Sequence, residues 1–194
     1  MTGVAGMDLH EAARHRVLIV EGCAGATRAG LLTWLSHRHG FAVERSPAEL
    51  PALDPARPYR ELLRLAGPLA VDSGFVGELV YGPLRRGHSR VTWIEAFDFA
   101  ETVAERGGAF VHLAAPPPAF TERLTGRGGT AAAATAAGIM AETEAAAAAY
   151  ERAFTTLAQH APVFTVRPDA VKYPASAVSW SSEHGLTHGR RIPR

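Results

Sequence analysis

The stretch that decides the fold runs from residue 16 to residue 29 and reads RVLIV followed by EGCAGATRA. Its first five residues form a short, partly β-branched apolar run that stops just before Gly22. A strand that is apolar at consecutive positions is covered on both faces, as in the middle of a parallel sheet. Beyond the loop, apolar residues follow with helical spacing at positions 31, 32, 34 and 35, up to a natural helix stop at Gly40. The stretch therefore predicts a buried strand, a tight glycine loop and a helix.

Outside this stretch, strand-like and helix-like segments alternate along the chain. Short apolar runs predict further strands at 41–43, 69–71, 109–113 and 163–166. Helical patterns are found at 59–65, after Asp72, at 94–106, at 119–125 and in the alanine-rich segment 131–160. Such alternation implies a parallel sheet with right-handed crossovers. We therefore predict an α/β fold with a five-stranded parallel sheet flanked by helices, over residues 15–172, after a flexible lead-in at 1–14 and before a polar tail at 173–194.

The composition is that of an ordinary globular protein. The chain has 194 residues, 47% of them apolar and 20% charged, which predicts one domain with a sizeable core. A formal net charge of +1 gives no reason to expect a nucleic acid or a membrane as partner. The single cysteine, Cys23, excludes an intramolecular disulfide and a cysteine-only metal cluster. We see no membrane-length apolar run and no signal sequence, so we predict a cytoplasmic setting.

The loop after the first strand has features of a phosphate-binding loop. Such a loop needs glycines that let backbone N–H groups approach phosphate oxygens, a helix N-terminus, and a long cation. Gly22 and Gly25 occupy the first and middle glycine positions of the pattern G-x-x-G-x-G-K-S/T, and Arg28 stands where the lysine belongs. We therefore predict that a nucleotide is bound by the loop residues Gly22, Cys23, Ala24, Gly25, Ala26, Thr27, Arg28 and Ala29.

The same loop departs from the pattern at three positions. Thr27 replaces the last glycine, and a β-branched residue resists a positive φ. Ala29 replaces the Ser or Thr whose hydroxyl normally holds Mg²⁺. Arg28 offers a planar fork in place of a compact ammonium group, and the two are not equivalent. A tight strand–helix turn without a ligand is the alternative interpretation.

Two further segments carry a family resemblance. VDSGFVGELVYG, at 71–82, resembles the "DR-x-x-x-SELVYG" segment of thymidylate-kinase-like and phage-type deoxynucleoside monophosphate kinases. FVHL at 110–113 and FTERLTGRG at 120–128 resemble their fourth strand and the "ERL-x-x-RG" start of their lid. The resemblance covers roughly residues 16–167 and implies a three-layer P-loop NTPase fold with a short lid at about 120–131. It also implies ATP and Mg²⁺ as cofactors, a small-molecule nucleoside or nucleotide as substrate, and a possible homodimer.

The resemblance implies roles for several side chains. Asp72 would lie beside the loop and bind Mg²⁺ through water or orient the attacking oxygen, although the family's next arginine is Ser73 here. Arg123 and Arg127 match the lid arginines that stabilise the transferring phosphoryl group, with a solvated helix face as the alternative.

Three more residues are candidates for substrate binding. Arg45 follows the second strand where thymidylate kinases carry a substrate-phosphate segment, but a surface arginine fits equally. Glu78 and Tyr81 lie one turn apart and would line a base or sugar pocket, unless Tyr81 belongs to the core. His112, inside a buried strand, is interpreted as a core histidine.

Three hypotheses for the function follow. The first is a nucleoside or nucleotide kinase that moves a phosphoryl group from ATP to a nucleoside or nucleoside monophosphate, with Arg28, Asp72, Arg123 and Arg127 as catalytic residues. The second is a catalytically impaired pseudokinase that acts as a nucleotide-binding or regulatory partner. The third is a metal-independent P-loop transferase, which the missing hydroxyl at Ala29 would suit.

Overall fold

The structure is a computed structural model that describes residues 9–23, 25–46, 50–51, 54–115 and 130–167, of which 25–26 and 130–140 are described by their backbone alone. The predicted lid arginines Arg123 and Arg127, most of the predicted lid and the predicted tail therefore lie outside the described residues, as does Ala24 of the loop.

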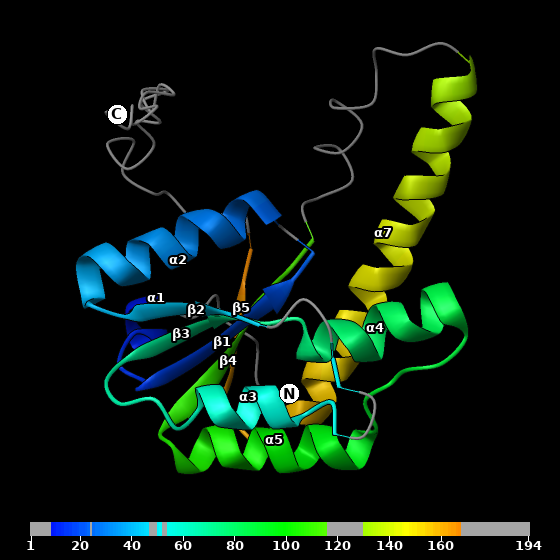
Figure 1. Cartoon of the computed structure of the whole chain (residues 1–194). Coiled ribbons are helices and arrows are strands. Elements are labelled where there is room, and N and C mark those ends of the chain that lie inside the picture. The colour runs from blue at the N-terminus through cyan, green and yellow to red at the C-terminus, as the bar shows by residue number, and fades with distance from the viewer. Residues whose placement is uncertain (1–8, 24, 47–49, 52–53, 116–129, 168–194) are drawn as a thin grey trace, which may run out of the picture.

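A parallel sheet of five strands forms the middle of the protein. Its strands are β1 (Val17–Gly22), β2 (Ala42–Arg45), β3 (Leu69–Asp72), β4 (Gly108–Leu113) and β5 (Val163–Val166). They lie in the order β2-β3-β1-β4-β5, so β1 is central (Figure 1). Every residue of β1 is buried. Val20 pairs with Asp72 of β3, and Gly22 pairs with Leu113 of β4. The carboxyl ends of these three strands consequently meet at one edge of the sheet.

Helices cover both faces of the sheet. On one face lie α1 (Leu9–Ala12) and α2 (Gly25–His39); on the other lie α3 (Arg57–Leu62), α4 (Phe75–Arg86), α5 (Trp93–Glu105) and α7 (Thr130–Leu157). Figure 1 shows α2 on one side of the sheet and α3 with α5 on the opposite side. Leu18 of β1 packs in the cluster on the α2 side, and Ile19 packs in the cluster on the other side. The predicted three-layer α/β architecture is confirmed.

Most element bounds agree with the sequence predictions to within a few residues. The predicted helix 119–125 lies outside the described residues. The short helix α1 falls inside the segment predicted to be a flexible lead-in, and its Ala12 is buried against the α2 side of the core. A helix of four residues carries too little periodicity for the sequence pattern to reveal it. Among the described helices, none is long and apolar enough to span a membrane.

The burial of His112 in β4 predicts how the stability of the protein changes at low pH. As expected from the sequence, His112 is a buried residue, and its ring stacks on Phe154 at 4.6 Å between centroids. Burial lowers the pKa of His112 from 6.5 to about 4. The unfolded chain therefore binds the proton more tightly, so stability falls as the pH drops from about 6.5 through about 4, by about 3 kcal/mol in full.

We expect the variant His112→Phe to lose less stability on acidification than the unmodified protein, because phenylalanine can stack on Phe154 but cannot be protonated. Urea unfolding at neutral pH and at about pH 4.5 measures both losses. Equal losses in the two proteins would contradict the assignment.

Candidate functional site

The bend between β1 and α2 starts at a glycine that no other residue can replace without strain. Gly22 has φ +138°, and a Cβ atom added there would lie 2.1 Å from the carbonyl oxygen of Leu113. The amide of Cys23 donates to that same oxygen at 3.2 Å. β4 therefore fixes the start of the bend, and the Cys23 amide is already used within the protein. α2 begins two residues later, at Gly25, with the positive end of its dipole at the bend.

Arg28, in the first turns of α2, reaches back across the bend. Its Nη1 lies 3.2 Å from Oδ1 of Asp72, and its Nη2 donates to the main-chain oxygen of Gly22. Each partner of the ion pair has a quarter of its side chain exposed, so solvent screens the pair only in part. Nε of Arg28 is buried and finds no acceptor among the described residues. The structure thus brings Arg28, Asp72 and Gly22 together at the carboxyl edge of the sheet.

The described residues at this edge do not fit a Mg²⁺ ion held by the protein. Ala29 has no oxygen to offer, and the Asp72 carboxylate is engaged by Arg28. Across the part of the chain that the structure describes, no three His, Cys, Asp or Glu side chains gather in an arrangement that would hold a metal ion. Mg²⁺ bound with phosphates still requires one or two carboxylates or hydroxyls from the protein.

Glu21, the residue before the glycine, has a role that the sequence analysis missed. Its carboxylate is completely buried; Oε1 accepts from the amide of Val76 at 2.9 Å, and Oε2 accepts from the amide of Gly77 at 2.7 Å. Burial raises the pKa of Glu21, against the effect of these bonds and of a bond from Ser73. Glu21 therefore ties the end of β1 to the start of α4. An acidic residue at the end of an otherwise apolar buried strand was the signal that could have found it.

Tyr81 lies beside the bend. Its hydroxyl and the thiol of Cys23 are hydrogen-bonded to each other, and burial raises the pKa of both groups. The guanidinium of Arg85 lies over the Tyr81 ring, 4.6 Å from its centroid. The Tyr81 side chain is half-buried, so it belongs partly to the core and partly to the surface next to the loop.

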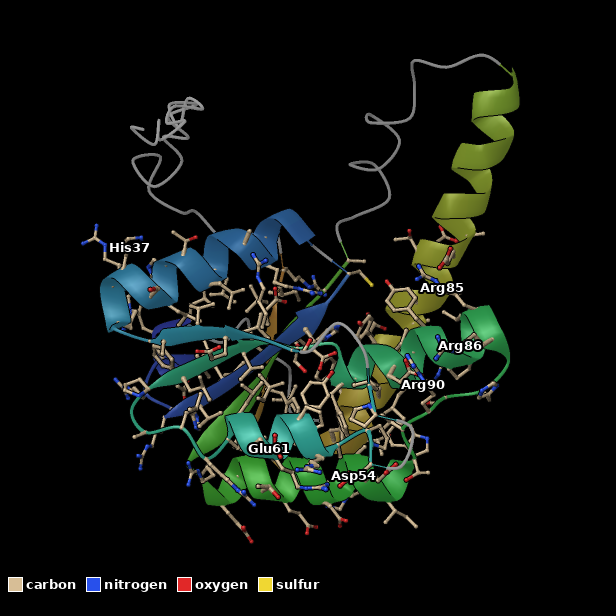
Figure 2. All side chains as sticks on the ribbon, viewed as in Figure 1. His37, Asp54, Glu61, Arg85, Arg86 and Arg90 are labelled. Atoms are coloured by element: carbon tan, nitrogen blue, oxygen red, sulfur yellow. The ribbon has the colours of Figure 1, made fainter. Side chains whose placement is uncertain are left out.

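Glu78, the other candidate on α4, is occupied by two arginines. Its buried carboxylate accepts from the amide of Arg90 at 3.0 Å and forms ion pairs with Arg86 and Arg90, which Figure 2 shows close to α4. Burial would raise the pKa of Glu78, but the hydrogen bonds from Arg90 and the two positive charges bring it below its ordinary value. Glu78 thus holds the connection from α4 to α5, in addition to any contact with a substrate.

Gly82, which ends the Glu-Leu-Val-Tyr-Gly run, also serves this connection. A Cβ atom added to it would lie 2.9 Å from the main-chain oxygen of His88. The glycine therefore lets the α4–α5 connection pass close to the helix. The contacts of the α4–α5 connection therefore account for two residues of the run, Glu78 and Gly82.

Arg45 lies at the same edge of the sheet as the bend. It is the last residue of β2, its side chain is exposed, and its register partner is Asp72 of β3. The amide of the next residue, Ser46, donates to the main-chain oxygen of Asp72 at 2.9 Å. The structure thus places Arg45 on the candidate site's edge.

Comparison with solved structures finds proteins of similar fold. No family model and no curated protein matches the sequence. The crystal structure of YorR from Bacillus subtilis, in complex with phosphorylated GDP, is similar, with a TM-score of 0.60 and 15% sequence identity over 78% of this chain and 85% of that chain. At this identity the likeness concerns the fold, and it agrees with the three-layer architecture described above.

Proposed function

We propose that this chain is a kinase-like phosphotransferase that binds ATP at the β1–α2 bend and moves a phosphoryl group to a nucleoside or nucleoside monophosphate. The observation that carries the proposal is the meeting of Arg28, Asp72 and Gly22 at the carboxyl edge of a parallel sheet. Open α/β sheets bind their ligands at this edge. YorR, which has a similar fold, was solved with phosphorylated GDP, and this supports a nucleotide as ligand.

In the proposed mechanism the residues position and neutralise phosphates. Backbone amides of residues 22–29 and the Arg28 guanidinium would hold the donor nucleotide. The Cys23 amide is an exception, because it donates to the Leu113 carbonyl oxygen. Asp72 would orient the attacking hydroxyl or phosphate oxygen, and Arg45 would face the acceptor. Arg123 and Arg127, from the predicted lid, would stabilise the charge that develops on the phosphoryl group in the transition state. A cytoplasmic homodimer remains part of this proposal.

The ion pair itself favours a second candidate function, a pseudokinase that binds nucleotide without turnover. Asp72 engages Arg28 at 3.2 Å, so the group proposed to orient the acceptor is tied to the group proposed to bind the donor. Losing one positioned charge or donor costs about 3 kcal/mol of transition-state stabilisation, enough to reduce turnover by a factor of about a hundred. Binding would survive such a loss, and catalysis would become very slow.

A thermal-shift measurement tests nucleotide binding. Saturating the folded chain with ATP or ADP at about 100 times Kd is expected to add about 2.7 kcal/mol of stability, which raises Tm by roughly 5 to 10 °C. At the same ligand concentration, we expect Arg28→Ala to remove at least about half of this rise. Arg57→Ala is the matched control, since Arg57 forms an exposed ion pair with Glu61 on α3, and it should keep the full rise.

The absence of a rise in the unmodified protein, or a rise that Arg28→Ala leaves unchanged, would reject the proposal. Where binding is found, a mass-spectrometric screen of nucleosides and monophosphates with ATP separates the two candidate functions. Phosphorylated products identify the kinase and its acceptor. Binding without any product identifies the pseudokinase.

A further inference from the structure

We propose that this site binds the polyphosphate of a nucleotide without a divalent cation, and that the Arg28 guanidinium takes the place beside Asp72 that Mg²⁺ would need. The inference rests on the proposed function and specifies how that same site neutralises phosphate charge. It follows from three features: the ion pair, an unused N–H group of Arg28, and the oxygens that the loop lacks.

The ion pair places a permanent cation against the carboxylate best placed to hold a metal. Nη1 of Arg28 lies 3.2 Å from Oδ1 of Asp72, and Nη2 is fixed by the main-chain oxygen of Gly22. A guanidinium stays charged at all physiological pH values. Mg²⁺ approaching Asp72 would therefore meet a positive charge at contact distance, and repulsion would weaken its binding.

Arg28 also has donors left for an anion. A guanidinium carries five N–H groups in a planar fork that matches two phosphate oxygens. In the described residues two acceptors are found for it, Asp72 and Gly22, and its buried Nε has none. Buried donors are nearly always paired in folded proteins. An acceptor from outside the described residues can complete this arrangement, and a phosphate oxygen suits it.

Two further positions near the bend, 29 and 21, offer no oxygen to a metal ion. The hydroxyl that would bind Mg²⁺ is missing at Ala29. Glu21, the second carboxylate near the bend, directs both oxygens at the amides of Val76 and Gly77 and is completely buried. A polyphosphate bound here would thus be neutralised by Arg28 and the α2 N-terminus rather than by a metal.

Titration calorimetry with ATP, once in EDTA and once in excess Mg²⁺, tests the inference. For the unmodified chain we expect the two Kd values to agree within about threefold, and we expect Arg28→Ala to weaken binding in EDTA at least about tenfold. Asp72→Asn should tighten binding in EDTA severalfold, because the carboxylate no longer competes with phosphate for Arg28. Arg57→Ala, an exposed arginine on α3, should match the unmodified chain.

A double variant, Arg28→Lys with Ala29→Ser, tests whether ATP binding can be made to depend on Mg²⁺. It restores the compact ammonium group and the hydroxyl of the usual loop, so we expect ATP to bind it at least about tenfold more tightly in Mg²⁺ than in EDTA. Circular dichroism and Tm establish that each variant is folded. Failure of the double variant to gain this dependence would overturn the assignment of the metal's place to Arg28.

The remaining outcomes separate this inference from the proposed function. ATP binding to the unmodified chain that is more than about threefold tighter with Mg²⁺ would overturn the metal-free inference and leave the nucleotide-binding proposal standing. Binding in neither condition would overturn both. Binding in EDTA that survives Arg28→Ala unchanged would show that the guanidinium does not neutralise the phosphates.

Discussion

Replacing Gly22 with alanine is expected to lower the free energy of unfolding by about 4 kcal/mol. Two costs add at this position. Its φ of +138° lies in a region that residues with a Cβ atom rarely adopt, and the new Cβ would lie 2.1 Å from the Leu113 carbonyl oxygen. That oxygen belongs to backbone that pairs with β1, so it cannot move aside without breaking the sheet at the candidate site.

Gly40→Ala is the matched control for this prediction. Gly40 also has a positive φ, +68°, but an added Cβ meets no atom within 4 Å. It should therefore cost only the backbone strain, about 1 kcal/mol. Urea unfolding followed by circular dichroism gives both values. Similar losses for the two variants would show that the contact with Leu113 is not what requires a glycine in the bend.

The sequence predicted the sheet and the bend because their signals are local. Consecutive apolar residues at 17–20 indicate burial on both faces, and Gly22 marks the point where the chain must turn. The meeting of Asp72 with Arg28 also follows from simple reasoning, since the carboxyl ends of neighbouring parallel strands share an edge. That the two side chains form an ion pair was not predicted, because a motif gives a residue's position and leaves its partner open.

Two of the contacts that the sequence did not predict depend on how separate elements pack together. Glu21 directly precedes the loop, yet its partners, the amides of Val76 and Gly77, lie 55 and 56 residues later in the chain. Glu78 was expected near a base or sugar, and its pairing with Arg90 depends on how the connection to α5 folds back. Such contacts are set by tertiary packing, which periodicity and spacing do not encode.

The second large effect is expected at Glu21. Changing it to alanine should lower the free energy of unfolding by about 4 kcal/mol, because two buried amides lose their acceptor and a cavity forms. Glu21→Gln keeps one acceptor oxygen and should cost about 2 kcal/mol. Glu61→Gln is the matched surface control, since Glu61 is half-exposed on α3 and pairs with Arg57, and it should cost less than about 1 kcal/mol. Equal losses for Glu21→Ala and Glu61→Gln in urea unfolding would contradict the bridging role.

The pH dependence of these variants follows from the buried carboxyl group. Burial raises the pKa of Glu21 above 4.5, so the folded chain binds the proton more tightly than the unfolded chain. The stability that this group contributes is therefore fully present below about pH 4.5 and is lost as the pH rises through the folded pKa. The Glu21 charge acts on Tyr59 and Tyr150, which lie nearby. Burial raises the pKa of both tyrosines above their ordinary values, so they do not titrate between about pH 4 and about pH 8.

Glutamine cannot ionise, so the stability difference between Glu21→Gln and the unmodified chain should shift in favour of the variant as the pH is raised from about 4 to about 8. Urea unfolding at several pH values measures this difference, from which groups that titrate alike in both proteins, His112 among them, cancel. A constant difference across the range would mean that Glu21 is ionised in the folded protein as readily as in the unfolded chain. The hydrogen bonds between β1 and α4 would then be made by an ionised carboxylate, whose charge the surrounding amides and Arg28 fully stabilise.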